Sequence, residues 1–137
     1  MCSRSVRNNY HTIVTTGGRH FDGLEATNLV DSVMFKYTLG MMIEPEKIVV
    51  CNGNAKGADE LVKIWCHKNG IHFFSCEPLW HIYDRPAGPL RNEIMLDIMH
   101  PNLLVAFPGG TGTQGTIKLA KEKRIKVLKF DHYSLFG

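Results

Sequence analysis

Short apolar runs alternate with longer amphipathic segments along the chain. The runs are five or six residues long, as in buried strands, and the segments between them carry apolar residues at a spacing of about 3.6. The pattern predicts strands over residues 11–16, 47–51, 71–76, 102–107 and 125–130. It predicts helices over residues 24–39, 58–68, 90–99 and 113–123. Such alternation predicts a Rossmann-like, doubly wound α/β fold, with a parallel sheet of about five strands and helices on both faces.

The segment over residues 77–89 (EPLWHIYDRPAGP) interrupts this alternation. It holds three of the chain's six prolines, so we expect it to be irregular. The 137 residues contain no internal repeat, linker or low-complexity stretch. The sequence therefore predicts a single nucleotide-binding domain over residues 1–137.

Three glycine-rich turns each follow a predicted strand: residues 15–18 (TTGG), 52–57 (NGNAKG) and 108–113 (PGGTGT). Glycine lets backbone N–H groups approach a ligand, and a helix that starts after the turn adds free donors that suit phosphate. In a doubly wound sheet the carboxyl ends of the strands share one crevice. The turns together predict a phosphate-bearing, nucleotide-like ligand.

Charge and hydropathy narrow the range of partners. The net charge of +3 suits a small anionic ligand and is too small to argue for a nucleic-acid groove. No apolar run approaches the roughly 20 residues that span a bilayer, and the N-terminus lacks the apolar core of a secretory signal. We expect a cytoplasmic protein (in the host cytoplasm if phage-encoded) that has no membrane partner.

The four cysteines form no CxxC pair and no cysteine–histidine set with zinc spacing. Cys51 and Cys66 fall in apolar patterns and are expected to be buried as small hydrophobic residues. A disulfide between Cys66 and Cys76 stays open as an alternative, although a reducing compartment is expected. We predict no metal site and no cofactor.

Four motifs together resemble the SLOG superfamily of Rossmann-like domains. They are TGGRHFDG (16–23), GNAKGADELVKIW (53–65), W-x-x-Y-D-R-P-A-G-P-L-R-N (80–92) and NLLVAFPGGTGT (102–113). The resemblance covers roughly residues 11–130 and is closest to the small YspA-like proteins of bacteria and phages. The superfamily includes the Lonely Guy phosphoribohydrolases, the DNA-processing protein A group, and domains proposed to bind NAD- or nucleotide-derived signals. A homo-oligomer is implied as well, because Lonely Guy enzymes build their sites across subunits.

One position departs from the Lonely Guy signature P-G-G-x-G-T-x-x-E, whose final glutamate is catalytic. Thr116 stands at that position, whereas the R-x-x-x-M motif of the family is matched by Arg91 and Met95. Loss of a catalytic acid typically lowers a rate by about 10²–10⁴-fold. The resemblance therefore implies a phosphate cradle without the family's acid, which favours binding over hydrolysis.

The predicted ligand site combines the three turns with the segment around Arg91. Arg19 and Lys56 are expected to contact phosphate, and Asp59 to accept ribose hydroxyls or only to complement the helix dipole. The glycines of the third turn form an anion nest or, alternatively, a loop that leaves Thr113 as helix N-cap. The predicted ligand-binding residues are Gly17, Gly18, Arg19, Gly53, Asn54, Ala55, Lys56, Gly57, Asp59, Arg91, Asn92, Pro108, Gly109, Gly110, Thr111, Gly112 and Thr113.

Two aromatic residues, Trp80 and Tyr83, fall in the proline-rich segment. Either a base stacks on one of them or both pack in the core or under a lid. Both alternatives are compatible with the sequence.

Three functions are compatible with these features. The first is a non-catalytic binder of a NAD- or nucleotide-derived molecule, such as ADP-ribose or cyclic ADP-ribose, that acts as a sensor or as a sponge for an immune signal. The second is a phosphoribohydrolase that uses another carboxylate; the candidates are Asp59, Glu60, Glu93 and Asp97. The third, single-stranded DNA binding, is disfavoured because no basic stripe with interleaved aromatic residues is present.

Overall fold

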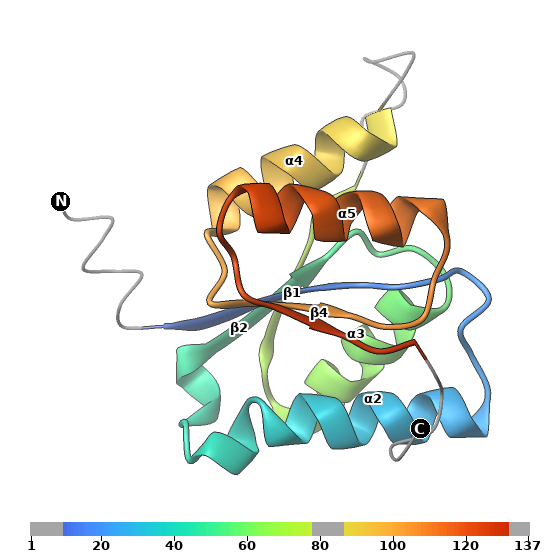
Figure 1. Ribbon diagram of the computed structural model, residues 1–137. Coiled ribbons are helices and arrows are strands. Elements are labelled where there is room, and N and C mark those ends of the chain that lie inside the picture. The colour runs from blue at the N-terminus through green and yellow to red at the C-terminus, as the bar shows by residue number, and fades with distance from the viewer. Residues whose placement is uncertain (1–9, 78–86, 132–137) are drawn as a thin grey trace, which may run out of the picture.

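A computed structural model describes residues 10–77 and 87–131 of the chain. It shows a five-stranded parallel sheet between two layers of helices (Figure 1). The strands are β1 (His11–Thr16), β2 (Ile48–Asn52), β3 (His72–Ser75), β4 (Leu103–Ala106) and β5 (Val127–Lys129). The helices are α2 (Leu24–Lys36), α3 (Ala58–Asn69), α4 (Ala87–Met99) and α5 (Thr111–Glu122), with short 3₁₀ turns η1 (Leu39–Met41) and η2 (Pro45–Lys47). The predicted Rossmann-like fold is confirmed.

The strand order β3-β2-β1-β4-β5 has one switch point, which lies between β1 and β4. The chain runs outward from β1 through β2 to β3, and then returns to the other side of β1 for β4 and β5. The crossovers on the two sides of β1 therefore separate above the carboxyl ends of β1 and β4. Ligands of doubly wound sheets bind at this switch point.

Each face of the sheet has its own core, because successive side chains of a strand point to opposite faces. In β1, Ile13 packs with the residues of α2 and α3, whereas Val14 packs with those of α4 and α5. In β4, Val105 and Leu104 divide in the same way. Figure 1 shows α4 and α5 on one face and α2 and α3 on the other. All four residues of β4 are buried, as expected for a strand covered on both faces.

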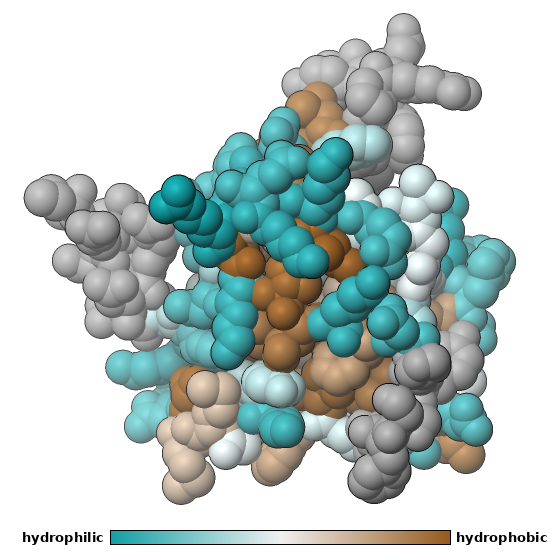
Figure 2. All heavy atoms as spheres, in the orientation of Figure 1, coloured by the Kyte–Doolittle hydropathy of each residue, from teal (hydrophilic) through white to brown (hydrophobic). Residues whose placement is uncertain are grey.

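One edge of the sheet is formed by β5, whose side chains are only partly covered. Val127 and Leu128 each pack against one of the two cores and remain partly exposed. Figure 2 shows apolar surface between the polar residues of the face on which Figure 1 places β5, between α5 and α2. The predicted homo-oligomer stays a prediction.

Two helix starts differ from the prediction. α4 begins at Ala87, inside the segment that was expected to be irregular, because Pro89 falls in the first helical turn, where the missing N–H has no helical partner. α5 begins at Thr111 instead of 113, and Gly110 is its N-cap. The alternative in which Thr113 caps this helix is therefore wrong.

The described cysteines behave as small apolar residues. Cys51 and Cys66 are buried, as predicted, and burial raises the pKa of each thiol to about 12. Cys76 is also free, so the alternative disulfide between Cys66 and Cys76 is not formed.

Candidate functional site

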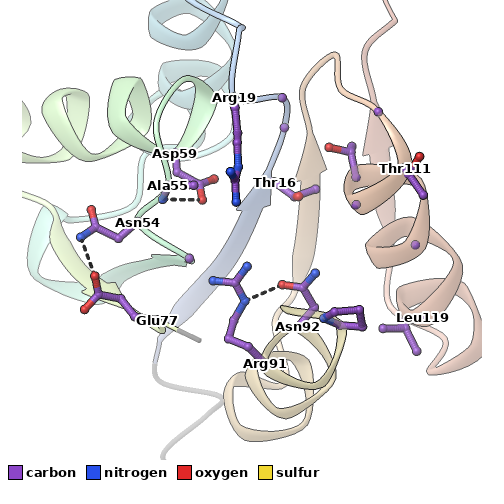
Figure 3. Close-up of a pocket in the computed structure, with 18 of the residues that line it drawn as sticks. Thr16, Arg19, Asn54, Ala55, Asp59, Glu77, Arg91, Asn92, Thr111 and Leu119 are labelled. Carbon is purple, nitrogen blue, oxygen red and sulfur yellow. Dashed lines mark hydrogen bonds between the residues drawn. The ribbon is translucent and has the colours of Figure 1, made fainter. Parts of the chain in front are cut away.

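A cleft of about 900 Å³ opens at the carboxyl ends of β1 and β2 and beside the first turn of α5. Its walls come from the turns after β1, β2 and β4 and from α4 and α5 (Figure 3). The volume lies within the range of roughly 300–1,000 Å³ that is usual for small-molecule sites. The cleft therefore lies at the switch point of the sheet.

Gly18 joins the turn after β1 to the two other turns. Its N–H donates to the carbonyl oxygen of Pro108 at 2.8 Å, and its carbonyl oxygen accepts from the N–H of Ala58 at 3.1 Å. Neighbouring glycines permit this approach: a Cβ on Gly17 would overlap that of Ala58, and one on Gly109 would lie 2.7 Å from the nitrogen of Gly18. Gly17 and Gly109 are thus required by contacts within the protein.

Gly57, the N-cap of α3, has a similar structural role. Its φ of 82° lies in a region that residues other than glycine rarely adopt. A Cβ at this position would also overlap the carbonyl oxygen of Gly18. The first N–H group of α3, that of Ala58, is already used by Gly18.

The N-terminus of α5 differs in that, within the part of the chain that the structure describes, its first N–H group is also free. No side chain caps the helix at Gly110, and the first helical bond is donated by Gln114 to the carbonyl oxygen of Gly110 at 3.0 Å. Within residues 10–77 and 87–131, the N–H groups of Thr111, Gly112 and Thr113 have no hydrogen-bond acceptor. A Cβ on Gly110 or Gly112 would meet no atom within 4 Å. This helix end offers free donors and a partial positive charge beside the cleft.

Asp59 lines the cleft from the first turn of α3 and is only 7% exposed. Its Oδ2 accepts from the N–H of Ala55 at 3.2 Å, whereas its buried Oδ1 has no partner within the described part of the chain. Burial raises the pKa of Asp59 from 3.8 to about 6, although the N–H of Ala55 and the charge of Arg91 act in the opposite direction. A carboxyl group that titrates near neutral pH therefore forms part of the wall.

Arg91 reaches the cleft from α4 and is held on several sides. Its Nη1 donates to the carbonyl oxygen of Cys76 at 2.7 Å, and its Nε donates to Oδ1 of Asn92 at 2.6 Å. The guanidinium also lies against Gly53, where a Cβ would overlap it. Arg91 forms no ion pair with a carboxylate among the residues that the structure describes. Its charge is therefore available to a ligand.

Asn92 links Arg91 to α5. Its Nδ2 donates to Oγ1 of Thr116 at 2.9 Å, and Oγ1 of Thr116 donates to the carbonyl oxygen of Gly112 at 3.0 Å. Thr116 is 1% exposed. Position 116 thus holds a buried hydroxyl that connects two helices.

Arg19 supplies a second positive charge. Figure 3 shows its side chain extending from the turn after β1 into the cleft, toward the level of Asp59 and Arg91. Glu77 lies at the opposite wall, where its Oε1 accepts from Nδ2 of Asn54 at 3.4 Å. The cleft thus contains two guanidinium groups and a helix N-terminus, together with two carboxyl groups on the side of β2 and β3.

The structure brings most of the predicted residues to this cleft. Those that line it are Gly17, Gly18, Arg19, Gly53, Asn54, Ala55, Asp59, Arg91, Asn92, Gly110, Thr111, Gly112 and Thr113. Those that do not line it are Lys56, Gly57, Pro108 and Gly109. Lys56 is exposed on the turn after β2 and does not line the cleft, and its predicted contact with the ligand stays a prediction. Trp80 and Tyr83 lie outside the described residues.

The four alternative catalytic carboxylates differ in whether they line the cleft. Glu60 and Glu93 are exposed and do not line the cleft. Asp97 forms an ion pair with Lys123 at 2.5 Å. Of the four carboxylates proposed from the sequence, Asp59 is the one at the cleft.

Six residues of the cleft wall were not predicted from the sequence: Thr16, His20, Glu77, Pro89, Gly115 and Leu119. Glu77 follows β3 by two residues, so the rule that ligands gather at the carboxyl ends of strands would have found it. Gly115 and Leu119 continue the face of α5 that starts at Thr111, at a spacing of four residues. Helical spacing would have identified these two.

Two absences apply to residues 10–77 and 87–131. No group of three or more histidine, cysteine, aspartate or glutamate side chains is arranged to hold a metal ion. No helix in these ranges is long and apolar enough to cross a membrane.

Comparison with known proteins supports the fold. No family model and no curated protein matches the sequence. Among solved structures, the chain is similar to the crystal structure of the structural-genomics target TM1055, with a TM-score of 0.58 and 16% identity over 85% of this chain and 71% of that chain. A "putative UDP-N-acetylglucosamine 2-epimerase" from Listeria monocytogenes aligns with 10% identity and a TM-score of 0.47, over 88% of this chain and 31% of that one. The similarity to TM1055 supports a Rossmann-like fold.

Proposed function

We propose that the chain binds a nucleotide- or NAD-derived small molecule, of the ADP-ribose or cyclic ADP-ribose type, in the cleft. The observation that carries this proposal is the N-terminus of α5, whose open N–H groups border the same cleft as the side chains of Arg19 and Arg91. Phosphate oxygens are strong acceptors, and both helix N-termini and guanidinium groups bind them well. The anionic part of the ligand lies among these groups.

The wall that holds Asp59 and Glu77 suits the sugar. Asp59 and Glu77 offer carboxylate oxygens there. In other dinucleotide sites, carboxylates accept hydrogen bonds from ribose hydroxyls. A cleft of about 900 Å³ is also larger than a phosphate ion requires. The charges of the two walls therefore favour a ligand that carries both phosphate and hydroxyl groups.

Binding without turnover is favoured by the side chain at position 116. Thr116 has no acidic group, and its hydroxyl is buried and hydrogen-bonded. The resemblance to SLOG domains supports the same conclusion, since that superfamily includes domains proposed to bind nucleotide-derived signals. The protein acts in this proposal as a sensor or as a sponge for such a signal.

A second function, phosphoribohydrolase activity, is favoured by Asp59. Burial raises its pKa to about 6. A general acid or base is most effective when its pKa lies near the working pH. Its unpartnered Oδ1 belongs to a residue of the cleft wall. In this alternative Asp59 replaces the acid that the sequence lacks at position 116.

Incubation with AMP, NAD, ADP-ribose and cyclic ADP-ribose tests both functions. Ligand that stays with the native protein during gel filtration and is released intact by heat supports the binder. Free base or ribose 5-phosphate in the supernatant supports the hydrolase, and loss of that turnover in Asp59→Asn would assign it to Asp59. Retention of none of the four ligands, with no products, contradicts both functions.

A further inference from the structure

The hydroxyl of Thr116 lies between the two elements that we assign to the phosphates. It donates to the carbonyl oxygen of Gly112 in the first turn of α5 at 3.0 Å. It also accepts from Nδ2 of Asn92 in α4 at 2.9 Å. The O–H donor of this hydroxyl and one of its two acceptor lone pairs therefore join α4 to the open end of α5.

Asn92 extends this connection to the guanidinium of Arg91. Its Oδ1 accepts from Nε of Arg91 at 2.6 Å, and the carbonyl oxygen of Cys76 accepts from Nη1 at 2.7 Å. Gly53 leaves the space in which the guanidinium lies. A guanidinium has five N–H donors, so three remain after these two bonds. Arg91 is thus a fixed group with spare donors and not a mobile side chain.

A fixed arginine and a free one select different ligands. A free arginine can move toward a single phosphate that the helix N-terminus already holds, and both then bind the same anion. A fixed arginine keeps its own anion position, apart from that of the helix but in the same cleft. A diphosphate can fill both positions, whereas a monophosphate can fill only one of them.

The acidic wall limits where these anions can lie. Asp59 is 7% exposed and its Oδ1 has no partner among the described residues. Together with Glu77, it places negative charge on the side of the cleft formed by the turns after β2 and β3. The guanidinium of Arg91 contacts the same two turns through Cys76 and Gly53 and supplies positive charge on that side, so phosphates are confined to the surroundings of Arg91 and of the N-terminus of α5.

We propose that Asn92 and Thr116 are positioning residues that hold Arg91 at a fixed place relative to the N-terminus of α5, so that the cleft selects ligands with two adjacent phosphates over monophosphates. The inference rests on the proposed function and names the ligand class of the same site. It also assigns a role to the threonine at the position of the missing catalytic acid.

Calorimetric titration with AMP and ADP tests this selection, because the two nucleotides differ by one phosphate. Magnesium is left out, since it would bind the phosphates itself. The unmodified protein is expected to bind ADP at least about tenfold more tightly than AMP, because ADP makes one additional charge-assisted contact. Thr116→Val removes the hydroxyl at nearly constant volume and is expected to reduce this ratio to about threefold or less. Thr116→Ser keeps the hydroxyl and should keep the ratio.

Arg91→Lys provides a second variant that does not depend on the buried site of Thr116. It retains the positive charge but loses the bond from Nε to Asn92, so the preference for ADP should fall while AMP binding changes little. Lys121→Ala removes an exposed charge on the last turns of α5, outside the cleft, and should leave both affinities unchanged. Thermal unfolding of each variant shows whether it is folded.

Equal affinities of the native sequence for AMP and ADP would overturn the inference but not the proposed function. The same holds if folded Thr116→Val and Arg91→Lys keep the native preference for ADP. Absence of binding for AMP and ADP as well as for NAD, ADP-ribose and cyclic ADP-ribose would overturn the proposed function, and the inference with it.

Discussion

The N-termini of α3 and α5 follow glycine-rich turns of similar appearance, yet they differ in what surrounds them. At α3, the N-cap Gly57 is buried against Gly18, which also accepts from the N–H of Ala58. At α5, the N-cap Gly110 is exposed, and a Cβ there would meet no atom within 4 Å. The protein itself requires glycine at position 57, whereas no contact among the described residues requires it at position 110, where the proposed ligand would.

The first consequence concerns stability at α3. Gly57→Ala introduces a Cβ at a φ of 82° and against the carbonyl oxygen of Gly18, so we expect the free energy of unfolding to fall by at least about 4 kcal/mol. Gly23→Ala is the matched control, because Gly23 has a φ of 91° but no atom within 4 Å of an added Cβ. Its cost should be about 1–2 kcal/mol. Equal losses in urea unfolding would show that the contact with Gly18 contributes nothing.

The second consequence concerns Asp59, whose buried carboxyl group makes the free energy of unfolding depend on pH. Its pKa rises from 3.8 in the unfolded chain to about 6 in the folded one, so folding takes up a proton between these values and stability falls as the pH rises through them. Asp59→Asn removes this loss. We expect it to raise the free energy of unfolding by up to about 3 kcal/mol at pH 8 and to change it little near pH 3.5. A difference that is the same at both pH values would contradict the proposed burial effect.

Gly110→Val tests the open end of α5. The first atom of the new side chain has room in the protein, and valine is a poor N-cap, so unfolding should be easier by only about 1 kcal/mol. Affinity for the ligand retained in gel filtration should fall at least about tenfold, because the side chain blocks the approach to the N–H groups of Thr111 and Gly112. A folded variant with native affinity would remove this helix end from the site.

Lys56→Ala should have the smallest effect. Lys56 is exposed and does not line the cleft, so its charge acts only over a distance through solvent. We expect affinity to fall by less than about twofold at low salt and not at all in about 0.5 M salt. A loss of tenfold that persists at high salt would place Lys56 in direct contact with the ligand.

The fold was predictable because local patterns determine it. Every described strand lies within one residue or two of the predicted runs, and the two cores follow from alternation in strands such as β1. The helix starts were less predictable, because the patterns locate apolar faces and not caps. Pro89 was read as a breaker, although in a first turn it costs no hydrogen bond.

The site was predictable in part. Gly110 and Gly112 were expected at the ligand and line the cleft, whereas Gly57 and Gly109 were also expected there, do not line it, and are in close contact with Gly18. The sequence shows that a turn needs glycine but not which neighbour requires it. The connection from Arg91 to Thr116 could not be predicted, since it joins side chains on two helices that approach only in the folded chain.

The most direct test of the difference between the two helix ends is an NMR titration of backbone amides with ADP-ribose. Hydrogen bonds to phosphate shift the resonances of the N–H groups that donate them, so the largest changes are expected at Thr111, Gly112 and Thr113. The amide of Ala58, which already donates to Gly18, should change little. Large changes at Ala58 with none at the three α5 amides, or no changes at any of the four, would contradict the account.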